Sequence, residues 1–326
     1  MKVGFIGLGR MGQGMAGRLQ SAGHDMLVSD PVPGQTDELV KGGAVAADSP
    51  AAATEGRDVV ISMLPSDPVL NAVLEGDGGL IAGMSSDCIH MAMGTHGVPA
   101  VNRANMLHQD AGQTFIACPV LGRPDLAAQG LLNLVPGGPA DAVNKVRPLL
   151  DVLGQRNIEV GENPQASTAV KIANNFVLGC AIETMGEAFS LVEKLGVEPA
   201  QFLEVMLQGL FGAPAYEVYG KMIVEKAWEG HGATAVIGLK DADLALEAAE
   251  SADMPLPSTH IWRNYLIKAI ERGEGHLDWA VMAREQARAS GLEKSYGDKN
   301  ETLCASGGYR NGGIAQPDAA ENTRPG

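Results

Sequence analysis

The sequence predicts an α/β protein in which a doubly wound, mostly parallel sheet is followed by an all-α domain, with one long helix between the two. Two observations lead to this fold class. Up to about residue 162, short apolar runs alternate with longer Ala-rich amphipathic segments, as they do in βαβ units on a parallel sheet. Beyond that point the chain shows helical periodicity and no further strand pattern.

Six short apolar runs of the first part are predicted as strands. They occupy residues 3–6, 26–29, 59–63, 88–91, 115–118 and 132–135. With the longer amphipathic segments between them, they give the alternation expected of βαβ units. We therefore expect the N-terminal domain to span residues 1–162.

The second part opens with a proline-free stretch, residues 166–195, whose apolar side chains recur every three or four positions. This predicts one helix of about 30 residues, closed by Gly196. Shorter helices are predicted at 199–209, 214–227, 235–252 and 258–272. We expect a helical domain over 163–292. Residues 293–326 are rich in Gly, Asn, Asp and Ser, which predicts a flexible tail.

Composition excludes several classes of protein. A formal net charge of -15 and an aromatic content of 4% argue against binding to nucleic acid. Gly, Pro and charged residues interrupt every apolar stretch, so no membrane segment is expected, and a strand pattern at the first residues leaves no room for an export signal. A cytoplasmic protein is expected. The four cysteines form no CxxC pair and the seven histidines show no ligand spacing, so no metal site is expected.

A glycine motif stands where a dinucleotide-binding loop belongs. It follows the first predicted strand and opens a helical segment, and its residues are Gly7, Leu8, Gly9, Arg10, Met11 and Gly12. In a Rossmann domain the first glycine permits the turn, the second admits the pyrophosphate and the third lets helix and strand pack. The alternative is a merely glycine-rich turn. The motif predicts that residues 1–162 are an NAD(P)-binding Rossmann domain.

Asp30 ends the next predicted strand, about 20 residues beyond the glycines, where a carboxylate can bind the ribose hydroxyls of the cofactor. It would repel a 2′-phosphate, which favours NAD, although NADP is not excluded. The alternative interpretation of Asp30 is a turn residue before Pro31.

Five further segments follow the glycine motif in order along the chain: Met63-Leu64-Pro65, Met91 to Thr95, Cys118 to Arg123, Lys171 to Asn175, and Lys240-Asp241. In these segments together, the sequence resembles the β-hydroxyacid dehydrogenase, or 3-hydroxyisobutyrate dehydrogenase-like, family over roughly its first 290 residues. The resemblance implies an NAD(P)-dependent enzyme related to 6-phosphogluconate dehydrogenase that interconverts a small acidic hydroxy acid and an aldehyde. The resemblance assigns Leu64, Pro65, Thr95 and Lys240 to the cofactor, and Asp241 to support of the site.

The proposed chemistry centres on Lys171. Hydride transfer to a carbonyl builds negative charge on oxygen and needs a proton donor, and a lysine partly removed from water has its pKa lowered toward the working range. Asn175 lies one helical turn further on and can orient the substrate or the lysine, with Asn174 beside it. The alternatives are a solvated lysine and a helix-packing amide.

The substrate loop departs from the family pattern. Where many members have Ser-Gly-Gly, this chain has Leu121-Gly122-Arg123. The guanidinium of Arg123 can bind an anion with two parallel hydrogen bonds, so a carboxylate, sulfonate or phosphate substrate is expected. The alternative is that Arg123 forms a surface salt bridge, for instance to Asp125.

Two other functions compete with this hypothesis. Imine reductases share the architecture, but they generally carry Asp or Tyr in place of Lys171, and a catalytically silent cofactor-binding homologue would be expected to lose the lysine. The long helix also has more apolar positions than one domain can cover, which predicts a homodimer or a higher homo-oligomer.

Overall fold

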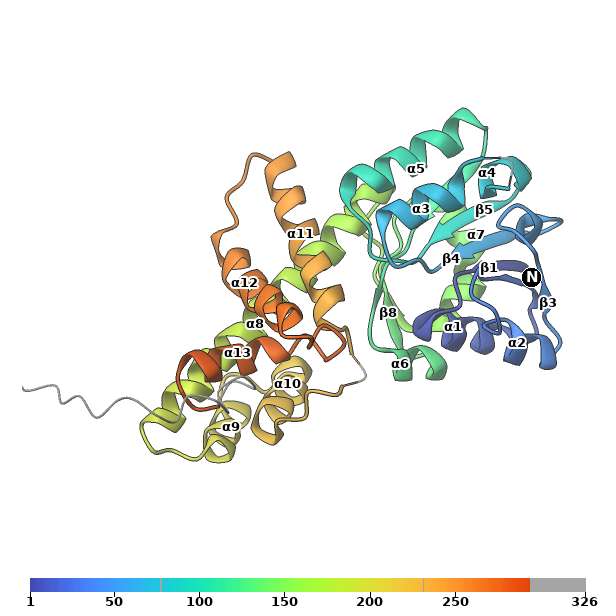
Figure 1. The fold of residues 1–326 in the computed structure, drawn as a ribbon. Coiled ribbons are helices and arrows are strands. Elements are labelled where there is room, and N and C mark those ends of the chain that lie inside the picture. The colour runs from blue at the N-terminus through green and yellow to red at the C-terminus, as the bar shows by residue number, and fades with distance from the viewer. Residues whose placement is uncertain (77, 231, 294–326) are drawn as a thin grey trace, which may run out of the picture.

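The computed structural model describes residues 1–76, 78–230 and 232–293, and it shows a sheet-containing half and a helical half connected by one long helix (Figure 1). The predicted fold class is confirmed. The tail prediction for residues 293–326 falls almost wholly outside the described residues.

The N-terminal half is built on a parallel six-stranded sheet with the order β3-β2-β1-β4-β5-β6. The order reverses its direction at β1, so the carboxyl ends of β1 and β4 lie next to each other, and in doubly wound sheets ligands bind at such a point. The strands are β1 (Lys2–Ile6), β2 (Asp25–Ser29), β3 (Val45–Ala46), β4 (Val59–Ser62), β5 (Ile89–Ala92) and β6 (Thr114–Ala117).

Helices cover both faces of this sheet, because its central strands are apolar on both sides. All four residues of β4 and of β5 are buried. The covering helices are α1 (Arg10–Ser21), α2 (Asp37–Lys41), α3 (Asp67–Leu74), α4 (Leu80–Gly83), α5 (Val98–Asp110) and α7 (Ala140–Leu153), with the short 3₁₀ helix η1 (Ala52–Thr54). Two separate apolar clusters, one on each face, form the core.

A second, three-stranded sheet follows the first and was not predicted as a separate unit. It consists of β7 (Val120–Leu121), β8 (Leu132–Leu134) and β9 (Gly154–Asn157), with α6 (Pro124–Gln129) between β7 and β8. The predicted strand at 132–135 is present, but as β8 it pairs antiparallel with β7 and parallel with β9. Strand β9 has the sequence Gly-Gln-Arg-Asn, so it gave no apolar signal.

The long helix α8 (Pro164–Lys194) connects the two halves. Its first turn is capped by the Asn163 side chain, which accepts a hydrogen bond of 2.9 Å from the Gln165 N–H, and Pro164 occupies the position that lacks an N–H partner. Gly196, with φ of +81°, follows its end as predicted. One stretch of α8 packs on α5 and β6, and the rest lies in the helical half.

The helical half packs around α8. Its helices are α9 (Pro199–Gln208), α10 (Pro214–Glu225), α11 (Ala235–Ser251), α12 (Pro257–Glu271) and α13 (Val281–Ala289), of which only α13 was not predicted. Its core holds Trp262 and Trp279, whose rings meet edge to face. Among the described helices, none combines the length and apolar character needed to cross a bilayer.

A directional chain of hydrogen bonds runs through the N-terminal core. The Gln113 amide donates to the carbonyl of Met84, so its oxygen accepts from His108 Nδ1 at 3.0 Å. His108 Nε2 then accepts from His90 Nδ1 at 2.9 Å, and His90 Nε2 accepts from Ser62 Oγ at 2.8 Å. Each ring in this chain uses one N–H and one lone pair, so both histidines are neutral. Ser62 ends β4, directly before the predicted cofactor segment.

Protonation of this chain should destabilise the fold. Burial lowers the pKa of His108 to about 4 and lowers that of His90 well below its usual 6.5. The folded-state pKa lies below the unfolded value, so the neutral histidines contribute fully to the free energy of unfolding above about pH 6.5. This contribution is lost as the pH falls toward 4, and for His108 alone the loss is about 3 kcal/mol.

Urea unfolding of wild type and of His108→Asn between pH 7.5 and 4.5 tests this. The variant should be less stable at pH 7.5 and should show a shallower dependence on pH. His260→Gln, at an exposed position, is the matched control and should follow the wild type. An unchanged pH dependence in His108→Asn would refute the argument.

Candidate active site

The glycine loop between β1 and α1 has the geometry that its motif predicts. Gly7 has φ of +91°, and a Cβ there would lie 2.4 Å from the Met63 carbonyl oxygen. A Cβ on Gly12 would lie 2.0 Å from the Gly7 oxygen, whereas one on Gly9 would meet no protein atom within 4 Å. The first and third glycines are therefore required by the fold itself. The open side of Gly9 is where a bound group can approach the backbone.

This loop fits a phosphate group. Leu8 is buried in the first turn of the motif, α1 begins at Arg10, and Met11 packs against the sheet core. No acidic residue lies in the first turn of α1, so no carboxylate of the helix itself competes for its N–H groups and the positive end of its dipole.

Asp30, which follows β2, lies against the same loop. Its Oδ2 accepts a hydrogen bond of 2.6 Å from the Leu8 N–H, and its Oδ1 accepts one of 2.8 Å from the Val32 N–H. The second bond is the turn interaction considered as the alternative. The first fixes the carboxylate beside the glycine motif, so the two interpretations of Asp30 are compatible in one conformation.

The segments after β4 and β5 extend the site toward the helical half. Leu64 is buried and Pro65 is exposed at the carboxyl end of β4. After β5, the carbonyl of Thr95 accepts a hydrogen bond of 2.9 Å from Lys240 Nζ of α11. Lys240 therefore joins the helical half to the edge of the sheet where the glycine loop lies.

Lys171 lies on α8 at the junction of the two halves. Its Nζ donates a hydrogen bond of 2.8 Å to the carbonyl of Val120 in β7. Burial lowers the pKa of Lys171 to about 8, with the nearby Asp241 opposing the shift and the positive charge of Lys240 adding to it. The lysine is thus not a fully solvated charge, and its ammonium and amine forms coexist near neutral pH.

Asn175 lies one turn further along α8 and is buried. Its Nδ2 donates a hydrogen bond of 2.7 Å to Asp241 Oδ2 on α11. The neighbouring Asn174 is exposed, and its Nδ2 lies 3.4 Å from Asn175 Oδ1. The amide of Asn175 therefore does pack between helices, and the same contact fixes its orientation one turn from Lys171.

The substrate loop leads from β7 into α6. Leu121 ends β7, Gly122 has φ of +148°, and Arg123 caps α6. Arg123 Nη2 lies 3.1 Å from Asp125 Oδ2, and both side chains are about 40% exposed, at 39% and 43%. The surface salt bridge considered as the alternative is thus present, but it is accessible to solvent and weak.

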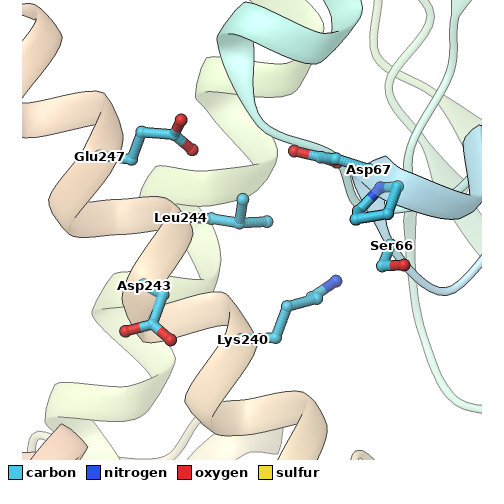
Figure 2. A pocket seen from close by; sticks show the side chains of 7 residues that line it. Ser66, Asp67, Lys240, Asp243, Leu244 and Glu247 are labelled. Carbon is cyan, nitrogen blue, oxygen red and sulfur yellow. The ribbon is translucent and has the colours of Figure 1, made fainter. Parts of the chain in front are cut away.

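A cavity of about 320 Å³ between α3 and α11 adds residues that the sequence did not indicate (Figure 2). Lys240 and Leu244 extend from α11 toward Ser66 and Asp67. The cavity joins segments more than 160 residues apart, and no motif connects them. Its lining residues are Ser66, Asp67, Pro68, Lys240, Asp243, Leu244 and Glu247.

Asp67 is held at the edge of this cavity by His96 and Gly97. His96 Nδ1 lies 3.0 Å from Asp67 Oδ1, and the Gly97 N–H is 3.1 Å from both carboxylate oxygens. Burial acts to raise the pKa of Asp67, but the hydrogen bonds from His96 and Gly97 outweigh it and the pKa is lowered. His96 therefore holds the Asp67 carboxylate in place through a hydrogen bond. No cluster of three potential metal ligands occurs among the described residues.

Comparisons with known proteins agree with this geometry. Residues 2–161 match the NAD binding domain of 6-phosphogluconate dehydrogenase, and residues 166–285 match the family described as NAD-binding of NADP-dependent 3-hydroxyisobutyrate dehydrogenase. The chain is 40% identical to an uncharacterized oxidoreductase of Bacillus subtilis over 87% of this chain and 99% of the relative. It is 33% identical to 3-hydroxyisobutyrate dehydrogenase of Pseudomonas aeruginosa over 80% of this chain and 90% of that enzyme.

A solved structure is similar as well. The 3-hydroxyisobutyrate dehydrogenase of Mycobacterium tuberculosis, determined with L-serine, matches with a TM-score of 0.80 and 25% identity, covering 87% of this chain and 98% of that one.

The open side of Gly9 yields a prediction. Gly9→Ala should keep its thermal stability, since the new Cβ meets no protein atom, but should weaken NADH binding about tenfold or more, because the methyl group occupies the approach of the phosphates. Gly17→Ala, on the same helix, adds a Cβ 3.9 Å from Leu39 and should bind NADH as the wild type does. Calorimetric titration with NADH measures both, and equal affinity in the two variants would exclude this loop as the phosphate site.

Proposed function

The chain belongs to the β-hydroxyacid dehydrogenase family and is an NAD(P)-dependent oxidoreductase that acts on hydroxyl groups, and from this premise we propose that Lys171 is the general acid and base of its reaction. The observation that carries the proposal is the position of Lys171: it lies at the junction of the two halves with a pKa of about 8. The reaction is the reversible conversion of a small acidic hydroxy acid to its semialdehyde.

The bound nicotinamide supplies or accepts the hydride. Lys171 does the complementary work on the oxygen: its ammonium donates a proton when the carbonyl is reduced, and its amine accepts one when the alcohol is oxidised. A pKa near the working pH allows both directions. The Val120 carbonyl, 2.8 Å from Nζ, holds the lysine in place and leaves its other hydrogens for the substrate.

Asn175 and Asn174 assist Lys171. The hydrogen bond from Asn175 to Asp241 uses one hydrogen of the side-chain amide. The second amide hydrogen and the amide oxygen are left to orient the substrate hydroxyl. Asn174, exposed beside it, contributes a second amide to the substrate.

The cofactor is proposed to lie along residues 7–12, with its middle portion against Leu64 and Pro65 and its nicotinamide end near Thr95 and Lys240. The support is geometric: these segments follow β1, β4 and β5 at one edge of the sheet, and Lys240 Nζ reaches the Thr95 carbonyl. Asp30 beside Leu8 favours NAD over NADP, because a fixed carboxylate repels a 2′-phosphate. Residues 1–162 would be the cofactor domain and 163–292 the substrate and dimerisation domain.

The substrate is proposed to be a small anion held by Arg123, with Leu121 and Gly122 shaping the loop around it. The exposed bond to Asp125 is weak enough to be replaced by a substrate carboxylate, sulfonate or phosphate, which can pair with the guanidinium through two hydrogen bonds.

A homodimer is the proposed assembly. Exposed apolar residues follow one stripe of α8 and its C-cap, at Val170, Val177, Leu191 and Leu195. A stripe of this kind on a helix that already buries its other side is suited to a second copy of the chain. Light scattering should give about twice the chain mass of 33.9 kDa.

The role of Lys171 predicts opposite pH profiles for the two directions. With a pKa of about 8, kcat for alcohol oxidation should rise through pH 8 as the amine form appears, and kcat for aldehyde reduction should fall over the same range. Lys171→Met should lower kcat by about 10²-fold to 10⁴-fold in both directions with NADH binding intact. Lys194→Met, exposed at the end of the same helix, is the control. Turnover retained by Lys171→Met would refute the assignment.

Arg123 predicts the class of substrate. In a panel of small aldehydes carrying carboxylate, sulfonate or phosphate, followed by loss of reduced nicotinamide, Arg123→Gln should raise KM for the preferred anion by about 10-fold to 100-fold and change kcat less. Asp125→Asn should lower KM, since it releases the guanidinium from its competing partner. An unchanged KM in Arg123→Gln would show that another group holds the anion.

A further inference from the structure

Arg10 forms a contact between the two halves that the proposed reaction does not use. It is the first residue of α1, inside the glycine motif, and its side chain leaves the N-terminal half. Its Nη2 donates a hydrogen bond of 3.2 Å to the carbonyl of Gly232, which lies 222 residues away in the connection between α10 and α11. Lys171 and Lys240 make similar bonds, each from a cation to a backbone carbonyl across the junction.

Gly232 is a firm anchor because it packs on a buried carboxylate. A Cβ on Gly232 would lie 2.5 Å from Asp278 Oδ2, and one on Gly230 would lie 2.8 Å from the same atom. Asp278 is 3% exposed, accepts a hydrogen bond of 3.0 Å from the Ala280 N–H, and donates its own N–H to the Trp228 carbonyl at 2.9 Å. The Gly232 carbonyl is thus fixed to the core of the helical half.

The charge of Arg10 acts on the Asp278 carboxylate. Burial raises the pKa of Asp278 to about 6, while backbone N–H groups of Ala280 and Gly232 and the guanidinium groups of Arg123 and Arg10 act against the rise. Arg10 and Arg123 of the proposed substrate loop therefore both lie near enough to act on the same buried carboxylate. The contact between Arg10 and Gly232 thus lies in the same region as that loop.

We propose that Arg10 is a positioning residue that couples the two halves of the molecule: its guanidinium bridges an anionic phosphate at the glycine loop and the Gly232 carbonyl, so that cofactor binding draws the helical half toward the N-terminal half. The inference rests on the proposed cofactor site. A guanidinium carries five N–H donors in a rigid fork, and one is used on Gly232. Arg10 is exposed, so the others are free to reach a phosphate bound at the N-terminus of α1.

The molecule contains its own probe for this coupling. Its three tryptophans, Trp228, Trp262 and Trp279, all lie in the helical half, whereas NADH is proposed to bind the other half. Energy transfer from tryptophan to bound NADH therefore reports the distance between the halves. It is measured at saturating NADH, after the affinity of each variant has been determined by calorimetry.

Arg10→Met should weaken NADH binding about threefold to tenfold and should reduce energy transfer even when the site is saturated. Arg10→Lys should bind NADH nearly as the wild type does, because it keeps the charge, but should also lose transfer, because a single ammonium lacks the planar fork. Arg103→Gln removes an exposed arginine of α5 and should change neither quantity.

If Arg10→Met, saturated with NADH, shows the same energy transfer as the wild type, the coupling is refuted and the proposed cofactor site is unaffected. Failure of the wild type to bind either NADH or NADPH would instead overturn the cofactor site, and with it the coupling.

Discussion

The buried carboxylate of Asp241 is the interaction on which the arrangement of the site depends. It binds Asn175 of α8 at 2.7 Å, lies 3.1 Å from Lys240 Nζ, and opposes the lowering of the Lys171 pKa. One side chain thus fixes α8 to α11 and sets the electrostatic environment of two lysines. A buried charge is costly unless it is paired, so these partners hold each other in place. Because Lys240 also reaches the Thr95 carbonyl, the sheet edge is tied to the same group.

Much of the fold could be predicted because its signals are local. The six predicted strands are all apolar runs, and α8 has a clear beginning at Asn163 and end at Gly196. The missed elements lack such signals: β3 and β7 have two residues each, and β9 is polar. The assignment of residues 132–135 to the main sheet could not be corrected from the sequence, because strand pairing depends on long-range contacts.

Candidate site residues could be named from the sequence where a motif places them within a few positions of each other. The glycine loop and the Lys171 to Asn175 turn belong to this class: the chain turns at Gly7 with a positive φ, and Asn175 follows Lys171 by one turn of α8. The contacts of Arg10 with Gly232, and of Lys240 with Thr95, join residues more than 140 positions apart. The cavity lined by Asp67 and Glu247 is likewise formed by residues far apart in the sequence. Such contacts depend on how the two halves of the chain meet, which the periodicity of the sequence does not indicate.

The distribution of charge bears on how the proposed anionic substrate would be oriented. The chain carries a net charge of -15, yet Arg10, Arg123, Lys171 and Lys240 gather around the junction of its two halves. The cavity beyond Lys240 is different, because Asp67, Asp243 and Glu247 line it and disfavour an anion there. The anionic substrate proposed above would therefore be attracted to the Arg123 side and repelled from the α3–α11 side. Because Lys171 lies at the junction between the two halves, the same charges would favour the orientation that the proposed role of Lys171 requires.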